Sequence, residues 1–317
     1  MIGALKRRGI LGINRRNADY TLAWNARRLY PLVDDKLATK RLCQAAGIAV
    51  PKLLAVAHSH LEARRLVDQL KGESAFVLKP ARGAMGNGIL VLEQREGKLW
   101  RGVKPYARVD FEYHAAGIIS GLYSLAGHAD DAMVEERLET HSVLAPLRDD
   151  GVPDIRVIVY RGIPVMSMMR LPTRLSGGRA NLHQGAVGIG IDLVTGCATN
   201  AMLRGHRIDK SPDTGKPLVG LELPDFDVVL RTAVAATDQT GLGYVGADVV
   251  LDAQLGPVVL ELNARPGLAI QLANRAGLLP RLDAVDARLG PRGAPAPALE
   301  LEERIELGRS LAARLTR

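Results

Sequence analysis

The sequence has few cysteines, few aromatic residues and no long hydrophobic run. Its two cysteines, Cys43 and Cys197, are too few for a disulfide framework or a four-thiolate zinc site. Aromatic residues make up only 4% of the chain and are not clustered, which disfavours nucleic acid as a partner because single strands need stacking platforms. No apolar run reaches the roughly 18 residues of a membrane span, and the start of the chain is a poor signal peptide. We therefore expect a cytoplasmic protein without a transmembrane segment.

Several familiar catalytic motifs are also missing. The seven histidines form no His-Glu-x-x-His pattern, and the chain contains no Gly-x-Ser-x-Gly nucleophile elbow. Neither cysteine lies in a local signature of a nucleophile. These absences disfavour a zinc enzyme and a serine or cysteine hydrolase.

The size and charge of the chain indicate a globular protein with a basic amino-terminal segment. Its 317 residues are 47% hydrophobic and 24% charged, which is typical of two or three packed domains. The net charge is +8, and residues 1–41 hold most of it, with ten Lys and Arg against three Asp. This segment is either a solvated helical surface or a basic arm that binds an anionic partner. Both alternatives stay open at the level of sequence.

Hydrophobic periodicity predicts helices that alternate with antiparallel hairpins. Helices are expected at residues 20–29, 35–47, 60–71, 226–242 and 297–317, and hairpins at 89–100, 155–172 and 246–263. We divide the chain into a basic helical leader at 1–34, a small subdomain at 35–135, a large subdomain at 136–290, and a linker with a terminal helix at 291–317.

The strongest chemical signal is the expected hairpin GADVVLDAQLGPVVLELN. Alternation along its second strand puts Glu261 and Asn263 on one face. If Asp252 pairs with Pro257, Asp248 lies directly across from Glu261. Buried carboxylates that face each other repel unless a cation joins them, and oxygen ligands favour Mg²⁺, with Mn²⁺ as a substitute. The alternative is an exposed hairpin with an outward polar face.

A second signal is the stretch FVLKPARGAMGNG. Lys79 closes an apolar strand, where a buried ammonium needs an anion such as a nucleotide phosphate; otherwise it extends to the surface. The loop that contains Gly83, Gly86 and Gly88 follows at once, and its backbone N–H groups can cover phosphates. The loop is not a P-loop, so it indicates a nucleotide site only together with the lysine and the acidic hairpin.

Arginines gather in the middle of the chain. Asp154 and Arg156 share one face of a strand, Arg170 ends the partner strand, and Arg179 and Asn181 alternate in the following loop. Arginine binds carboxylates and phosphates bidentately and stabilises a developing oxyanion. Each arginine alone is explained equally well by a surface salt bridge, but together they predict an anion pocket.

The order of these motifs resembles the ATP-grasp superfamily over residues 34–271. The matching segments are DK…GIAVP, FVLKPARGAMGNGI, the hinge MVEERLE and DVVLD…VVLELNARPG. Within the superfamily, PDIRV and RANLHQGAVG are similar to the α-L-glutamate ligase-like branch and to sugar-transfer-associated ATP-grasp proteins. The resemblance implies an α+β ATP-grasp fold in which two α/β subdomains with antiparallel sheets clasp ATP. The usual first domain would be reduced to the short basic leader.

The resemblance also implies a role for each matching residue. Lys36 and Lys79 would bind the α- and β-phosphates, and the glycine loop would close over the γ-phosphate. Glu135, Glu136 and Leu138 would lie along the adenine and ribose, with the ribose carboxylate open between Glu139 and Asp154. Mg²⁺ would bind to Asp248, Glu261 and Asn263, and the reacting groups would face Arg156, Arg170, Arg179 and Asn181.

These roles predict an ATP-dependent carboxylate–amine ligase that forms an amide or peptide bond through an acyl phosphate. A small-molecule or peptide carboxylate and an amine such as an amino acid would be the substrates. The leader, the extra segment 99–130, a partner protein or a second copy of the chain would complete the substrate site. Three alternatives stay open: a kinase-like ATP-grasp phosphotransferase, a non-catalytic ATP-binding protein, and a protein whose basic arm binds an anionic partner.

Overall fold

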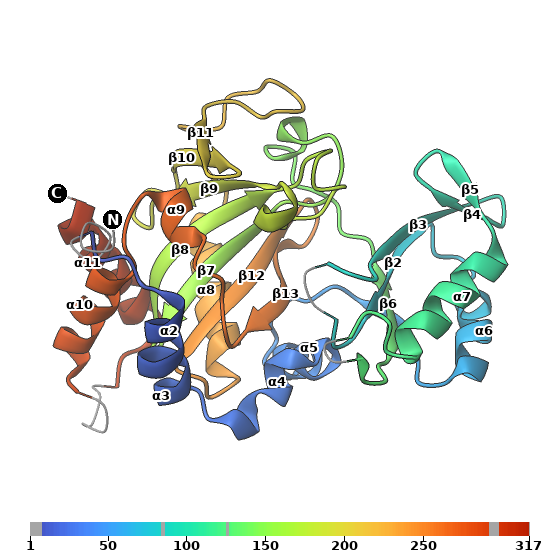
Figure 1. Cartoon of the computed structure of the whole chain (residues 1–317), viewed down its shortest axis with the longest axis horizontal. Coiled ribbons are helices and arrows are strands. Elements are labelled where there is room, and N and C mark those ends of the chain that lie inside the picture. Colours follow the sequence, from blue (N-terminus) through green and yellow to red (C-terminus); the bar gives the residue numbers. More distant parts are fainter. Residues whose placement is uncertain (1–7, 84–85, 125–126, 292–297, 317) are drawn as a thin grey trace. The chain divides into compact units, whose positions relative to one another are not determined.

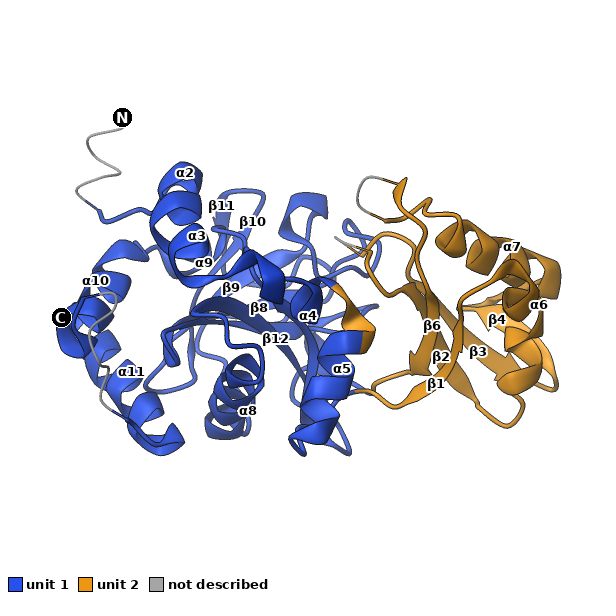
Figure 2. Cartoon of the chain, turned by 90° about the horizontal axis from the view of Figure 1, so that it is seen from below, with its two compact units in different colours: residues 1–34, 38–50, 139–317 blue, residues 35–37, 51–138 orange. Residues whose placement is uncertain are grey.

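The protein consists of two compact units, each considered by itself (Figure 2). The computed structural model describes residues 8–83, 86–124, 127–291 and 298–316. Unit 1 contains residues 1–34, 38–50 and 139–317, and unit 2 contains residues 35–37 and 51–138. The expected domain boundaries stay a prediction.

Unit 2 is a six-stranded antiparallel sheet with two helices on one face (Figure 1). In spatial order its strands are β1 (Leu53–Ala57), β6 (Ala132–Glu136), β2 (Ala75–Pro80), β3 (Leu90–Arg95), β4 (Lys98–Arg101) and β5 (Lys104–Tyr106). The helices are α6 (His60–Gln69) and α7 (Arg108–Ile119). Leu66 of α6 and Phe111 of α7 pack with Phe76 of the sheet in one buried cluster, which holds the layers together.

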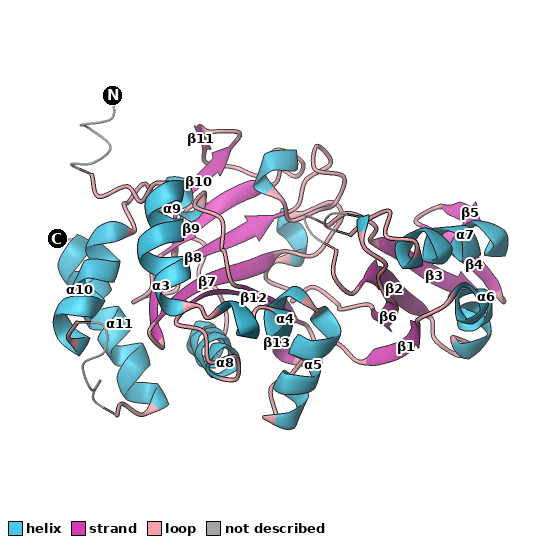
Figure 3. Ribbon diagram, turned by 60° about the horizontal axis from the view of Figure 1, so that its bottom comes forward, coloured by secondary structure: helices cyan, strands magenta, loops and turns pink. Residues whose placement is uncertain are grey.

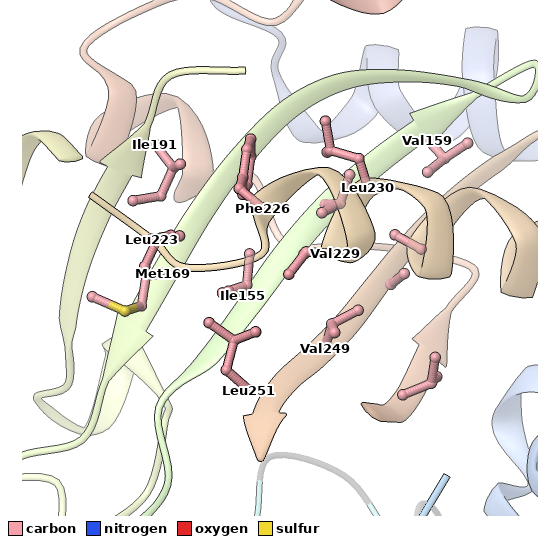
Figure 4. Packing of buried hydrophobic residues seen from close by; sticks show 14 of the residues in the cluster. Ile155, Val159, Met169, Ile191, Leu223, Phe226, Val229, Leu230, Val249 and Leu251 are labelled. Atoms are coloured by element: carbon pink, nitrogen blue, oxygen red, sulfur yellow. The ribbon is translucent and has the colours of Figure 1, made fainter. Parts of the chain in front are cut away.

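Unit 1 is built on a seven-stranded antiparallel sheet (Figure 3). In spatial order its strands are β11 (His206–Ile208), β10 (Ala198–Leu203), β9 (Val187–Ile191), β8 (Ile163–Leu171), β7 (Asp154–Tyr160), β12 (Tyr244–Asp252) and β13 (Gly256–Asn263). Helix α8 (Phe226–Asp238) packs on one face, where Val229 and Leu230 meet Ile155 and Val249 (Figure 4). Alternation along the strands leaves the other face for the charged residues considered below.

The opposite face of this sheet is covered by the amino-terminal segment and by helices from the end of the chain. The covering elements are α2 (Ile13–Arg15), a π-helical segment η1 (Arg16–Thr21), α3 (Leu22–Trp24), α9 (Ile270–Asn274) and α10 (Leu279–Leu289). The remaining helices of unit 1 include η2 (Arg27–Leu29), α4 (Pro31–Asp34), α5 (Lys36–Ala45, whose first two residues belong to unit 2), η4 (Ala145–Leu147), η5 (Leu182–Gln184) and α11 (Leu301–Thr316). Leu11 and Tyr20 are buried in this layer, so residues 8–30 form part of the fold.

The two antiparallel sheets with flanking helices confirm the predicted α+β class. The helix expected at 20–29 is wrong in its extent, because the chain turns extended at Asn25, whose side chain bonds to the sheet instead. The terminal helix begins at Leu301 rather than at residue 297. Strands β10 and β11 and helices α9 and α10 were not expected. Along the described part of the chain, no helix combines the length and apolar character needed to cross a bilayer.

Candidate functional site

The acidic hairpin of unit 1 brings Asp248 and Glu261 opposite each other, as predicted, but through a different register. The expected pairing of Asp252 with Pro257 is wrong, because Asp252 pairs with Gly256 and the loop is one residue shorter. A β-bulge with one extra residue before Glu261 restores the alignment. The two carboxylates therefore lie on the same face of neighbouring strands.

Asn263 lies beside the two carboxylates on this face. Its Nδ2 lies 3.3 Å from Asp248 Oδ2 and 3.3 Å from Glu261 Oε1. Because the two ends of an amide can exchange by rotation, Oδ1 can face a cation in the same place. Two carboxylates and an amide fit the ligand preference of Mg²⁺. Among the described residues no group of three His, Cys, Asp or Glu side chains could hold a metal, and this set has two such side chains, so the candidate metal centre stays a prediction.

Two arginines bind Asp248, one from the neighbouring strand β7 and one from β8 on the far side of β7. Arg156 donates from Nε to Asp248 Oδ1 at 2.7 Å and from Nη2 to Oδ2 at 2.6 Å. Arg170 donates from Nη2 to the same Oδ2 at 2.6 Å and binds both oxygens of Asp154 at 2.5 and 2.7 Å. We call these four residues the arginine–aspartate network. Sequence reasoning placed Asp154 and Arg156 on one face of a strand and Arg170 at the end of the partner strand, but missed the pairing of both arginines with Asp248.

The network sets opposite directions of pKa shift in its two acids. Burial opposes ionisation of Asp248, but the two guanidinium groups outweigh it and hold the pKa of this carboxyl below its usual range. Burial raises the pKa of Asp154 to about 7 despite the charge of Arg170, and Asp248 adds to the rise. Asp248 is therefore kept ionised, as a metal ligand or an arginine anchor must be.

Arg179 and Asn181 lie in the loop between β8 and β9. Asn181 Oδ1 accepts a hydrogen bond from His183 N at 3.0 Å and begins the short helix η5. Arg179 is exposed and donates to Gln184 Oε1 at 3.4 Å. These contacts are made within the loop, so a pocket that combines all four expected anion-binding residues stays a prediction.

In unit 2, Lys79 and Glu135 form a buried ion pair. Lys79 is paired in the sheet with Met133, and Val77 with Glu135, so the two charged side chains are diagonal neighbours on one face. Both side chains are less than 10% exposed. The sequence predicted an anion beside Lys79, and Glu135, expected along the adenine or ribose, supplies one within the protein itself.

The glycine loop is joined to Lys36. The Nζ of Lys36 donates a hydrogen bond to the carbonyl of Gly83 at 2.6 Å. Gly86 and Gly88 have φ values of 75° and 77°, where glycine is favoured. A Cβ atom on Gly88 would also lie 2.6 Å from Cγ of Tyr123. The described ends of this loop thus require glycine for both backbone and packing reasons.

The remaining expected nucleotide residues of unit 2, Glu136 and Leu138, lie at and just after the end of β6. Glu136 Oε1 accepts from Lys52 N at 2.6 Å, and Glu136 N donates to Lys52 O at 3.0 Å, which fastens the chain before β1 to β6. Leu138 is buried. Residues 84–85, in the middle of the expected loop, lie outside the described residues.

Residues 15–287 match the protein family described as sugar-transfer associated ATP-grasp. The match spans most of the chain and includes all of the candidate residues above. The chain belongs to the sugar-transfer associated ATP-grasp family. Membership confirms the ATP-grasp fold predicted from the order of the motifs.

This ATP-grasp protein is also similar to curated proteins from two named bacteria. It is 28% identical over 234 residues to the "Probable alpha-L-glutamate ligase" of Maridesulfovibrio salexigens. It is 26% identical over 234 residues to the protein of the same name from Halorhodospira halophila. Each alignment covers 74% of this chain and 56% of the relative, so the chain spans about half the length of the curated relatives it matches.

Two solved ligase structures are similar to this ATP-grasp protein at low identity. The ATP-grasp ligase PsnB, complexed with a minimal precursor, is 18% identical with a TM-score of 0.44, over 83% of this chain and 63% of that chain. The D-alanine–D-alanine ligase from Bacillus anthracis, complexed with ATP, is 11% identical with a TM-score of 0.42, over 90% and 68%. Likeness of this degree assigns neither residues nor substrate.

Proposed function

We propose that this ATP-grasp protein is an ATP-dependent carboxylate–amine ligase that uses Mg²⁺ and works through an acyl phosphate. The observation that carries the proposal is the acidic hairpin, in which Asp248 and Glu261 face each other beside Asn263. Carboxylate and amide oxygens gathered on one face of neighbouring strands are the ligands that Mg²⁺ prefers in proteins. Mg²⁺, when bound there, would offset the charge of the phosphates.

The nucleotide itself would be bound by residues of unit 2. Lys36 and Lys79 supply cations for the phosphates, and Glu135 holds the Lys79 ammonium in one position on the sheet. Backbone N–H groups of the loop from Gly83 to Gly88 would cover the γ-phosphate and keep water from the acyl phosphate. Glu136 and Leu138 are proposed to lie along the adenine and ribose.

The arginines would act on the reacting carboxyl group. Arg156 and Arg170 bind the aspartates through Nε and Nη2, so the Nη1 group of each takes no part in the network. Held in this way, their positive charge can stabilise the oxyanion that forms when an amine attacks the acyl phosphate. Arg170 engages both oxygens of Asp154, so we assign Asp154 to positioning Arg170 and leave the ribose to the exposed Glu139.

The substrates we propose are a small-molecule or peptide carboxylate and an amino acid as the amine. The relatives named probable α-L-glutamate ligase make glutamate the first amine to test. The arginines favour an anionic partner, which suits a carboxylate that is converted to an acyl phosphate.

The test is Mg²⁺-dependent release of ADP from ATP, with mass spectrometry of the products, in pools of acids, peptides and amino acids. Wild type is compared with Glu261→Gln and Lys79→Ala, and Glu302→Gln, which breaks an exposed ion pair with Arg231, is the control. A condensation product lost only in the first two variants supports the ligase. A phosphorylated product alone would indicate a phosphotransferase, and failure to bind ATP would refute the assignment altogether.

A further inference from the structure

The amino-terminal segment, residues 8–30, packs on the face of the sheet to which Asp248 and Glu261 belong. Tyr20 and Trp24 meet the ring of Tyr160 edge to face, with centroids 5.5 and 5.7 Å apart. The backbone of Gly243 donates to the carbonyl of Trp24 at 3.1 Å, and a Cβ on this glycine would lie 2.9 Å from Cβ of Trp24. The segment is therefore fitted closely to the start of β12.

Asn25 in this segment serves as an extra pairing residue of the sheet. Its Nδ2 donates to the carbonyls of Tyr244 at 2.7 Å and Ala264 at 2.9 Å, and its Oδ1 accepts from Tyr244 N at 2.9 Å. Asn25 is buried, so these three bonds cannot be replaced easily by water. One amide thus ties the first residue of β12 to the residue directly after Asn263.

Arg16 bonds to the loop of residues 264–267, which follows β13, two residues beyond the carbonyl of Ala264. Its Nη1 donates to the carbonyl of Pro266 at 2.9 Å, and the residue is 7% exposed. Within the described part of the chain, no carboxylate lies at ion-pair distance from this guanidinium, and its Nε has no hydrogen-bond partner. A buried charge without a paired acid is costly to keep, which argues for a role beyond stability.

Arg156 of the network also lies beside this loop. Its Nη1 is 3.9 Å from the position that a Cβ atom would take on Gly267. Residues 264–267 therefore have Asn25 and Arg16 bonded to their carbonyls and a proposed oxyanion-binding arginine next to their end. A shift of this loop would move both the end of β13 and the surroundings of Arg156.

We propose that Asn25 and Arg16 are positioning residues for the candidate metal centre. By fixing the loop 264–267, they hold Glu261 and Asn263 in register with Asp248. The consequence for metal binding rests on the proposed function, but the positioning itself does not. Arg16 and Asn25 are buried parts of the fold, whereas the choice between a solvated helical surface and a basic arm stays a prediction for the exposed basic residues of this segment.

The positioning is tested by hydrogen exchange of the whole protein, which needs no ligand. Arg16→Met and Asn25→Ser are compared with Asn200→Ser, a buried control in β10 whose amide donates to Ala273 O at 2.9 Å. We expect the amides of residues 261–268 to exchange at least about tenfold faster in the first two variants and to be unchanged in the control. Unchanged exchange in a folded variant would overturn the proposal.

The effect on the site is tested with Mn²⁺ and a non-hydrolysable ATP analogue, followed by the EPR signal of free Mn²⁺. We expect Arg16→Met to weaken Mn²⁺ binding by at least about fivefold and Arg16→Lys, which keeps a donor and the charge, to recover most of it. If Asn25→Ser fails to fold, the comparison of Arg16→Met with Arg16→Lys tests the proposal by itself. Faster exchange with unchanged Mn²⁺ affinity would overturn the positioning role. Failure of the wild-type protein to bind Mn²⁺ and nucleotide would instead overturn the proposed function, whatever the exchange result.

Discussion

Replacing Asp248 by asparagine tests how strongly the arginine–aspartate network holds unit 1 together. The change keeps the shape of the side chain but removes the charge that accepts three hydrogen bonds from two guanidinium groups. Arg170 retains its two bonds to Asp154, whereas Arg156 loses the carboxylate to which it is bidentate. The cost therefore comes mainly from one buried guanidinium left without its acid, and we expect a loss of about 3–5 kcal/mol in the free energy of unfolding.

The assay is urea unfolding followed by the fluorescence of Trp24, the only tryptophan in unit 1, in a Trp100→Phe background. Glu302→Gln is the control, because it breaks a bidentate pair that is exposed, and we expect no measurable change. Adding Arg156→Met to the asparagine variant removes the uncompensated charge, so the double variant should be more stable than the sum of the single losses by about 0.5–3 kcal/mol. A loss below about 1 kcal/mol for Asp248→Asn, or strict additivity of the pair, would refute the reasoning.

Three further predictions concern single side chains. Lys79→Met should weaken Mg²⁺–ATP binding by at least about tenfold in calorimetric titration, since it removes a phosphate-binding cation; unchanged affinity in the folded variant would contradict that role. Gly88→Ala should lower unfolding free energy by about 1–3 kcal/mol in thermal denaturation, because its Cβ meets Tyr123 at 2.6 Å and its φ is 77°; a variant as stable as wild type would show that the loop relaxes. Burial raises the pKa of the Cys43 thiol to about 11, so at pH 8 we expect Ellman's reagent to titrate Cys197 alone in the native protein and both thiols in denaturant; two fast thiols in the native state would be the contrary result.

The parts of the fold that depend on local pattern could be predicted from the sequence. The hairpin at Arg161 and Gly162 follows from two β-rich runs about a short turn, and the structure has both residues at positive φ. The facing of Asp248 and Glu261 was predicted for a similar reason, since alternation fixes which residues share a face. The register that produces it was not, because a single extra residue in one strand leaves no mark in the hydrophobic pattern.

The parts of the site that depend on strand order could not be predicted in this way. Arg156 reaches Asp248 because β7 and β12 are neighbours in the sheet, although the residues are 92 positions apart in sequence. Lys79 meets Glu135 because β2 pairs with β6. Asn25 was expected inside a helix because the local pattern is helical. Its bonds to distant backbone atoms cannot be read from helical propensity. Local sequence therefore supplied the chemical groups, and tertiary pairing decided which of them meet.

The bulge before Glu261 has a second consequence, which concerns self-association. Strand β13 is the last strand of its sheet, and the unpaired edge of such a strand is a template on which another chain can add. The extra residue, Leu260, interrupts the regular spacing of donors and acceptors, and Val259 N is already bonded to the carbonyl of Ala49 at 2.9 Å. The irregularity that aligns the two carboxylates thus also makes this edge a poor starting point for aggregation.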